Sequence, residues 1–158
     1  MKKNNYKIYI GLLIILLLQS GCQKAPINNL IEGMWKLEEY TTHEDNVTHS
    51  CERIYYSIQL WTVEVAEKQG SHGYKSSIGR FIYGENENEI IMKDFYYRNW
   101  TTDSKEATNV EDLKPYGLNN LETIFEIVQL DKHSLILRSD YATLRFKSFV
   151  TIQNWRID

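Results

Sequence analysis

The sequence predicts an all-β protein, an antiparallel up-and-down β-barrel. The chain after residue 29 is rich in aromatic and β-branched residues, which fit the half-buried surface of a sheet. Its apolar runs are short and separated by polar turns, a spacing typical of antiparallel hairpins. Such a sheet must close or double over, because its edges and its apolar face need protection from water.

Alternation of apolar and polar residues identifies the strands. Apolar side chains alternate from Ile54 to Leu60, and the parity then changes at Trp61. This predicts one long strand with a bulge or a sharp bend. The run from Ala142 to Val150 alternates most clearly. Further strands are expected at Ile31–Leu37, Tyr74–Tyr83, Glu89–Tyr97, Thr123–Leu130 and Ser134–Ser139.

One long polar segment, Arg98–Asn120, interrupts the strands. Connections of this length are usually functional or flexible. Asp103 or Ser104 is expected to cap a short helix that runs through Leu113, with Pro115 ending it. We interpret the segment either as a lid over the barrel mouth or as a surface excursion with no role in ligand binding.

The first residues have the composition of a secretory signal. A basic start precedes an apolar run from Ile8 to Leu18, and Ser20-Gly21 precedes Cys22. This resembles a bacterial lipoprotein signal, although Gln19 stands where an aliphatic residue is usual. The resemblance implies that Cys22 is lipidated and becomes the mature N-terminus. The apolar run is too short to span a bilayer as a helix.

These features divide the chain into three parts. Residues 1–21 are expected to be the signal peptide, 22–29 a tether that begins at the lipidated cysteine, and 30–158 one barrel domain. The membrane is then a partner through the acyl chains on Cys22, and two or three such chains hold a protein firmly. We expect a location in the bacterial cell envelope. The outer membrane is favoured, because Gln23 is not the aspartate associated with inner-membrane retention in some bacteria.

Charge and motifs exclude several classes of function. The net charge of −3 becomes about −6 once the three lysines of the signal are removed, which argues against a nucleic-acid partner. No catalytic motif or cofactor-binding motif is present, so we expect neither an enzyme nor a cofactor. His43, His49 and Cys51 lie close together, but their spacing matches no metal-ligand pattern, and a solvated turn is expected there.

Both ends of the expected barrel resemble a known family. Gly33-Met34-Trp35, followed near the end of the chain by Phe125–Leu137 and Ala142–Lys147, is similar to the lipocalin-like lipoproteins of Bacteroidetes. The resemblance implies three barrel-closing roles. Gly33 would allow a bend where a side chain would crowd the closed end, and Trp35 would plug that end. Arg145 or Arg156 would lay its guanidinium over the indole.

Aromatic residues gather in the middle strands, and they suggest a binding cavity. The interior of an eight-stranded barrel is either filled by its own side chains or holds one small ligand. Two functions remain open. One is a membrane-tethered envelope lipoprotein that binds a small apolar or amphipathic ligand, and the other is a non-catalytic interaction protein with a filled barrel that binds an envelope protein. The candidate cavity-lining residues are Tyr56, Ile58, Leu60, Trp61, Phe81, Tyr83, Phe95 and Tyr97.

Overall fold

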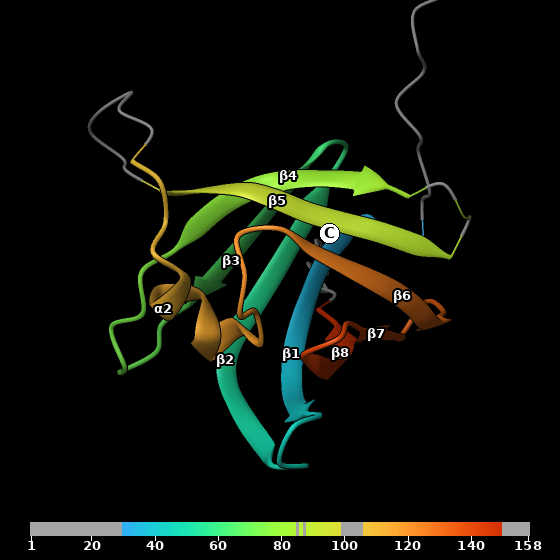
Figure 1. Ribbon diagram of the computed structural model, residues 1–158, viewed down its shortest axis with the longest axis horizontal. Helices are drawn as coiled ribbons and strands as arrows, with labels where there is room; N and C mark the ends of the chain where they lie inside the picture. The colour runs from blue at the N-terminus through green and yellow to red at the C-terminus, as the bar shows by residue number, and fades with distance from the viewer. Residues whose placement is uncertain (1–29, 85, 87, 99–105, 150–158) are drawn as a thin grey trace, which may run out of the picture.

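The sheet closes into a barrel of eight antiparallel strands, which confirms the predicted fold class (Figure 1). The computed structural model describes residues 30–84, 86, 88–98 and 106–149. The expected signal peptide, the tether and Cys22 lie outside the described residues. The strands are β1 (Gly33–Thr42), β2 (Thr48–Gln59), β3 (Thr62–Glu67), β4 (Ser77–Tyr83), β5 (Glu89–Tyr97), β6 (Thr123–Leu130), β7 (Ser134–Arg138) and β8 (Ala142–Ser148).

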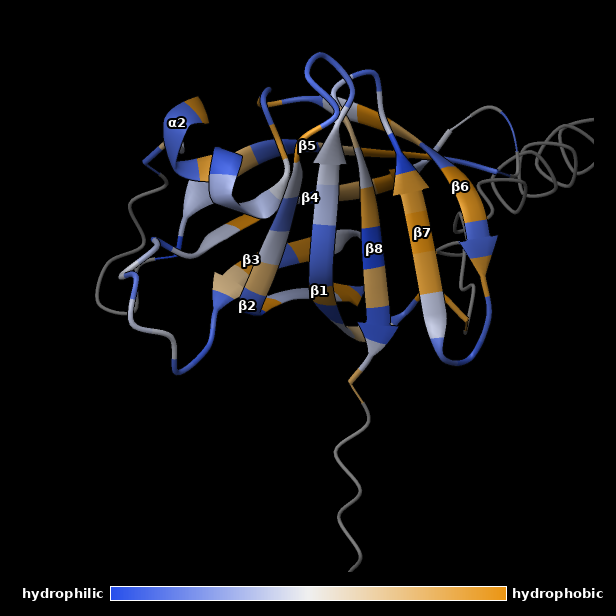
Figure 2. Ribbon diagram, turned by 90° about the horizontal axis from the view of Figure 1, so that it is seen from below, coloured by the Kyte–Doolittle hydropathy of each residue, from blue (hydrophilic) through white to orange (hydrophobic). Residues whose placement is uncertain are grey.

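The barrel has two unlike ends. We call the end where β1 begins the base, and the end toward which the β1 arrow points in Figure 2 the mouth. Each strand pairs with its neighbours in sequence, and β1 also pairs with β8. The base therefore carries the turns 60–61 and 131–133 and the described residues of 84–88. The mouth carries 43–47, 68–76, 139–141 and the described residues of 98–122.

Side chains that point into the barrel form its core. In β8, Ala142, Leu144 and Phe146 are buried while Arg145 and Lys147 are exposed, as expected for a strand whose successive side chains face opposite sides. The same alternation recurs in the other strands, and the buried apolar side chains form one continuous cluster. The hydrophobic effect across this single cluster holds the barrel together.

Trp35 closes the base. Its side chain is 2% exposed, and its Nε1 donates a hydrogen bond to the carbonyl oxygen of Ile31 at 2.8 Å. Gly33 enters the strand at φ 136°, a conformation that side-chain-bearing residues rarely adopt. A Cβ at Gly33 would meet nothing within 4 Å. Backbone conformation therefore explains this glycine, and the crowding expected from the sequence does not.

Arg145 does not lie over the indole, so that expectation is wrong. Trp35 pairs with Ser148 in β8, and Arg145 pairs with Glu39 on the outer face of the wall. Arg145 Nε lies 3.4 Å from Glu39 Oε1. Because Arg145 stands between inward-facing neighbours, it must face solvent. The alternative, Arg156, lies outside the described residues.

The predicted long strand is two strands. β2 ends at Gln59, β3 begins at Thr62, and these two residues pair across a hairpin. Leu60 and Trp61 form its loop, with Leu60 at φ 52°. Two-residue loops of this kind usually carry Gly, Asn or Asp. The change of parity at Trp61 therefore marks a turn that has no residue typical of turns, and the predicted bulge is wrong.

The helix in the long segment is shorter than predicted. The Asn109 side chain accepts a hydrogen bond from the backbone N–H of Glu111 at 3.0 Å and caps α2 (Val110–Leu113). A 3₁₀ turn, η1 (Lys114–Tyr116), follows and contains Pro115. Proline is tolerated there because the first N–H groups of a helix need no partner within it. Asp103 and Ser104 lie outside the described residues.

Replacing Trp35 tests the closure of the base. Trp35→Ala is expected to lower the free energy of unfolding by about 3–5 kcal/mol, because it leaves a cavity in the core. Trp61→Ala, at the exposed hairpin loop, is the matched control and is expected to change it by about 0.5 kcal/mol or less. Urea unfolding followed by circular dichroism measures both. Equal losses in the two variants would contradict the assigned role of Trp35.

Candidate functional site

A short helical lid lies over the mouth. We define the lid as residues 110–118, which comprise α2, η1 and the two residues after them. The side chains of Leu113, Tyr116 and Leu118 are completely buried and belong to the core cluster of the barrel. Figure 2 shows α2 at the mouth end. The lid therefore adds core side chains to those that the strands supply.

The lid is seated by direct contact with the barrel wall. The buried Tyr56 hydroxyl donates a hydrogen bond to the carbonyl oxygen of Tyr116 at 2.6 Å. Gly117 follows at φ 78°, and a Cβ there would lie 3.2 Å from Cγ of both Tyr40 and Leu144. A glycine thus provides both the left-handed turn and the close approach. Burial raises the pKa of Tyr56 well above its usual value, so this hydroxyl stays protonated and donates.

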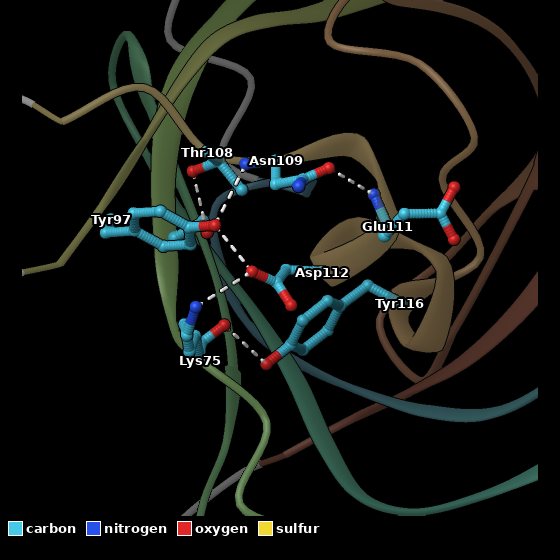
Figure 3. A network of polar contacts seen from close by, with 8 residues as sticks. Lys75, Tyr97, Thr108, Asn109, Glu111, Asp112 and Tyr116 are labelled. Atoms are coloured by element: carbon cyan, nitrogen blue, oxygen red, sulfur yellow. Dashed lines mark hydrogen bonds and ion pairs between the residues drawn. The ribbon is translucent and has the colours of Figure 1, made fainter.

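Three side chains, which we call the latch, fasten the edge of the lid (Figure 3). Asp112 of the lid accepts a hydrogen bond from the Tyr97 hydroxyl at 2.5 Å, and its Oδ2 lies 3.2 Å from Lys75 Nζ. Lys75 Nζ also lies 4.7 Å from the centroid of the Tyr97 ring, a cation–π contact. The latch joins the lid to the end of β5 and to the loop between β3 and β4.

Further side-chain hydrogen bonds continue the latch in both directions. The Tyr97 hydroxyl accepts from the backbone N–H of Asn109, the helix cap, at 3.0 Å. The Tyr116 hydroxyl donates to the carbonyl oxygen of Lys75 at 3.1 Å. Just before the lid, the Thr108 hydroxyl donates to the buried Ser77 hydroxyl at 3.0 Å. The lid is thus held at its start, its centre and its end.

Charge distribution makes the latch sensitive to pH. The hydrogen bond from Tyr97, followed by the contact with Lys75, lowers the pKa of Asp112. The same carboxylate raises the pKa of Lys75. Both groups are therefore held in their charged forms when the lid is closed.

Four of the expected cavity-lining residues point into the barrel. Tyr56, Ile58, Phe81 and Phe95 have exposed fractions between 0 and 3%. They pack against other core side chains, and the Tyr56 ring meets the Phe146 ring edge-on with centroids 4.9 Å apart. In the closed form these residues line an interior that is occupied by side chains.

The other four expected residues lie elsewhere. Tyr83 is half-buried near the base, with its ring edge-on to Phe81 at 5.3 Å. Tyr97 is half-buried at the mouth, in the latch. Leu60 and Trp61 are 47% and 38% exposed, so the expectation that they line a cavity is wrong. They form the hairpin loop at the base, outside the interior.

Sequence patterns did not identify the lid residues that complete the site. Asn109 followed by the acidic pair Glu111-Asp112 is a recognisable helix start. An asparagine cap accepts a hydrogen bond from an N–H of the first turn, and acidic side chains are stabilised at the positive end of the helix dipole. The burial of Tyr116 had no such signal. Its immediate neighbours are Pro115 and Gly117, which give no periodic pattern, and the hydroxyl that bonds to it comes from the distant strand β2.

The histidines and the cysteine near the mouth have structural partners. His43 Nε2 lies 2.9 Å from the Thr143 hydroxyl oxygen, and the His49 ring stacks on Tyr40 with centroids 4.7 Å apart. Burial raises the pKa of the Cys51 thiol to about 11, which keeps it protonated and unreactive. Within the described part of the chain, no group of three or more His, Cys, Asp or Glu side chains is placed to hold a metal ion.

A large groove lies on the outer wall of the barrel. It has a volume of about 880 Å³ and borders β6 and β7. Its lining is mostly polar and includes Asn88, Glu126, Arg138 and Tyr141. Arg138 already pairs with Glu126 at 3.4 Å.

The helices that the structure describes include none long and apolar enough to cross a membrane.

Comparisons with known proteins agree on the fold. A family model described as a lipocalin-like domain matches residues 15–149. A lipocalin-like protein from Bacteroides uniformis ATCC 8492 is similar in structure, with a TM-score of 0.54, 18% identity and coverage of 75% of this chain and 98% of that one. An uncharacterized protein from Bacteroides eggerthii DSM 20697 gives a TM-score of 0.55, 17% identity and the same coverage. A search of curated proteins gave no match. At these identities the solved structures support the fold alone.

Acid is expected to loosen the lid through Asp112. Because the closed lid lowers the pKa of this carboxyl, the latch contributes fully above the ordinary aspartate pKa of about 3.9 and is lost as pH falls through the lowered value. Hydrogen-exchange protection of the lid amides should therefore drop as the pH falls from about 5 through the lowered pKa of Asp112, relative to amides of β7 and β8. Asp112→Asn should remove most of this dependence.

Asp131→Asn is the matched control for that experiment. The pKa of Asp131 is also lowered, but by Gln129 and backbone N–H groups in the turn at the base. This variant should leave the pH dependence of the lid unchanged. A lid whose protection follows pH equally in all three proteins would contradict the role given to the latch.

Proposed function

The chain belongs to the family of lipocalin-like domains, and we propose that it is a lipid-anchored envelope protein whose barrel binds a small apolar or amphipathic molecule. One observation carries the binding part of this proposal. The lid inserts the buried side chains of Leu113, Tyr116 and Leu118 into the mouth. These side chains occupy the place that an apolar ligand would take.

The lid works as an internal plug that a ligand replaces. When the lid lifts, the apolar wall around Tyr56 and Phe81 loses its cover, which is unfavourable in water. A ligand that covers the wall restores this burial, and so it stabilises the open form. The ligand must be apolar over the surface that faces the wall, because the buried side chains there, among them Phe81 and Phe95, carry no charge. The Glu67 side chain at the mouth is 3% exposed, but its carboxylate already pairs with His72.

One polar group inside the barrel favours an amphipathic ligand. The Tyr56 hydroxyl is buried, and its acceptor is the carbonyl oxygen of Tyr116 in the lid. Lid opening removes that acceptor, and an unpartnered buried hydroxyl is costly. A ligand with a carbonyl, ether or carboxylate oxygen near its inner end would replace the acceptor. Fatty acyl and other oxygen-bearing apolar molecules have this chemistry.

The latch sets a low barrier to opening. The Lys75 and Asp112 side chains are 63% and 34% exposed, and exposed ion pairs of this kind contribute roughly 0–1 kcal/mol. Most of the free energy that keeps the lid closed therefore comes from apolar burial, which a ligand can replace. Binding without catalysis is the role that we propose, since the polar groups at the mouth fasten the lid to the wall.

The proposed membrane anchoring rests on the N-terminal sequence. A basic start, a short apolar run and Ser20-Gly21 before Cys22 support export and lipidation. The tether would then reach the barrel at its base, next to Leu30. In this arrangement the mouth and its lid lie at the end away from the anchor, accessible to molecules in the surrounding compartment. The outer membrane is our proposal for the site of attachment.

A filled interior favours a second candidate function. Tyr56, Ile58, Phe81 and Phe95 are packed as in an ordinary core. In this alternative the lid stays closed, and the barrel is a rigid scaffold that presents its outer surface to an envelope protein. Small-molecule binding distinguishes the two candidates.

Cys22→Ser tests the anchor. In bacteria fed with alkyne-labelled palmitate, the wild-type protein should incorporate the label and fractionate with membranes. The variant should do neither, because the serine hydroxyl is not a substrate for thioether formation. Cys51→Ser is the control and should retain both properties, since Cys51 lies in the wall of the barrel. Label in the Cys22→Ser variant would contradict lipidation at this residue.

Ligand binding is tested with the purified protein. Native mass spectrometry should find a small apolar molecule that co-purifies with it, and a fluorescent apolar probe, N-phenyl-1-naphthylamine, should compete for the site. Tyr97→Phe removes a hydroxyl of the latch and so raises the population of the open form, and the probe should therefore associate several-fold faster and bind more tightly by a similar factor.

Lys114→Ala is the matched control for the probe experiment. Lys114 lies in the lid but pairs outward with Glu111 at 2.8 Å, on exposed side chains. Its association rate should equal that of the wild type. If no molecule co-purifies and the probe binds none of the proteins, the second candidate function is supported.

A further inference from the structure

We propose that the base of the barrel rests on the membrane, with the Leu60-Trp61 hairpin loop at the boundary between lipid headgroups and acyl chains. This inference rests on the lipid anchor proposed above and adds a protein surface that contacts the bilayer. The surface, which we call the base patch, consists of Leu30, Leu60 and Trp61. Their exposed fractions are 45%, 47% and 38%.

The base patch lies where the tether would enter the barrel. The backbone N–H of Leu60 donates a hydrogen bond to Glu32 Oε1 at 3.2 Å, which holds the hairpin loop against the chain that leads into β1. Leu30 is two residues before Glu32. The carbonyl oxygen of Trp61 accepts from the N–H of Phe81 at 2.8 Å. The backbone on both sides of the loop is therefore fixed, and its two apolar side chains stay at the base.

The residues of the loop are unusual for a turn in water. Leu60 adopts φ 52°, a conformation that is unfavourable for a leucine and that Gly, Asn or Asp adopts more readily. Trp61 follows, and the pair exposes two large apolar side chains at the tip of a hairpin. At a bilayer surface, exposed Leu60 and Trp61 side chains are favourable because they can leave water. Tryptophan prefers the interface, where its ring is buried and its N–H remains hydrated.

Tether length limits how far the base can be from the bilayer. The eight residues from Cys22 to Asn29 span at most about 29 Å when fully extended. The mouth lies at the opposite end of the strands, so a barrel held by this tether presents its base to the membrane. Contact through the base patch would fix the orientation that the tether alone restricts.

Local charge selects the type of lipid surface. The exposed Lys132 lies in another turn at the base and lines a small surface hollow with Leu30 and Glu32. Lys132 can meet a lipid phosphate and Glu32 a choline or ethanolamine group. The mature chain has a net charge of about −6, which opposes binding to a strongly anionic surface. The fitting partner is a zwitterionic phospholipid bilayer.

Brominated lipids test the contact in the full-length lipidated protein. The protein is placed in phosphatidylcholine vesicles that carry bromine near the top of the acyl chains, and fluorescence is compared between wild type and Trp61→Phe. The difference isolates the emission of Trp61. Bromine should remove about half or more of this emission, because the indole lies within the depth of the quencher.

A tryptophan on the wall of the barrel is the matched control. Ile124 is 53% exposed on the outer face of β6, where it pairs with Ile91 of β5 and lies outside the base patch. In the Trp61→Phe/Ile124→Trp variant, the new tryptophan should show no quenching above that of Trp61→Phe. Equal quenching of Trp61 and of the tryptophan at 124 would overturn the proposal, since it would show that no particular face meets the lipid.

Mass spectrometry of the N-terminal peptide separates this proposal from the anchor. An acylated Cys22 with unquenched Trp61 would overturn the contact at the base and leave the lipid anchor intact. An unacylated Cys22 would overturn both. Quenching of Trp61 together with an acylated Cys22 supports the proposed orientation.

Discussion

The ladder between β1 and β8 is the constraint on which the rest of the structure depends. Its register runs from Trp35 opposite Ser148 to Thr42 opposite Ala142. Closure gives every strand two neighbours and leaves no open edge. It also fixes the width of the interior, because eight strands enclose little more than their own side chains. Every inward-facing position thereby becomes a core position, and both open ends of the barrel must be covered.

The two ends are covered in different ways, and this difference gives the molecule its direction. At the base, Trp35 belongs to a strand and bonds to Ile31 four residues earlier in the chain. At the mouth, the lid comes from a long connection and is fastened by partly exposed groups such as Asp112 and Lys75. Elements with exposed polar fastenings open more readily than the strands of a core. The proposed function therefore assigns ligand entry to the mouth.

Sequence periodicity predicted the strands well where one face is core and the other is solvent. The last strand is an example, because Leu144 and Phe146 alternate with charged residues. The hairpin loop at Leu60 and Trp61 escaped prediction, since its residues are apolar and lack the chemistry of turns. Arg145 was assigned to the indole by resemblance, although the alternation of the strand already places it outside.

The candidate site was only partly predictable, because it combines residues that are distant in the chain. Phe81 and Phe95 were recognised as interior residues from the aromatic content of their strands. The burial of Tyr116 depends on the hydroxyl of Tyr56, which is 60 residues away in sequence. No local sequence pattern predicts such a contact. Asn109 is a residue type that caps helices, but so are Asp103 and Ser104, and sequence alone favoured those two.

An even number of strands brings the chain back to the end of the barrel at which it started. The N–H of Phe149, just after β8, bonds to the carbonyl oxygen of Met34 at the beginning of β1 at 2.8 Å. The two longest connections, 68–76 and the one between β5 and β6, are at the other end. Insertions and deletions in those longer connections can therefore accumulate without disturbing the end where the chain enters and leaves. A barrel with this parity can vary the residues at its mouth while the end at which its first strand begins and its last strand finishes stays the same.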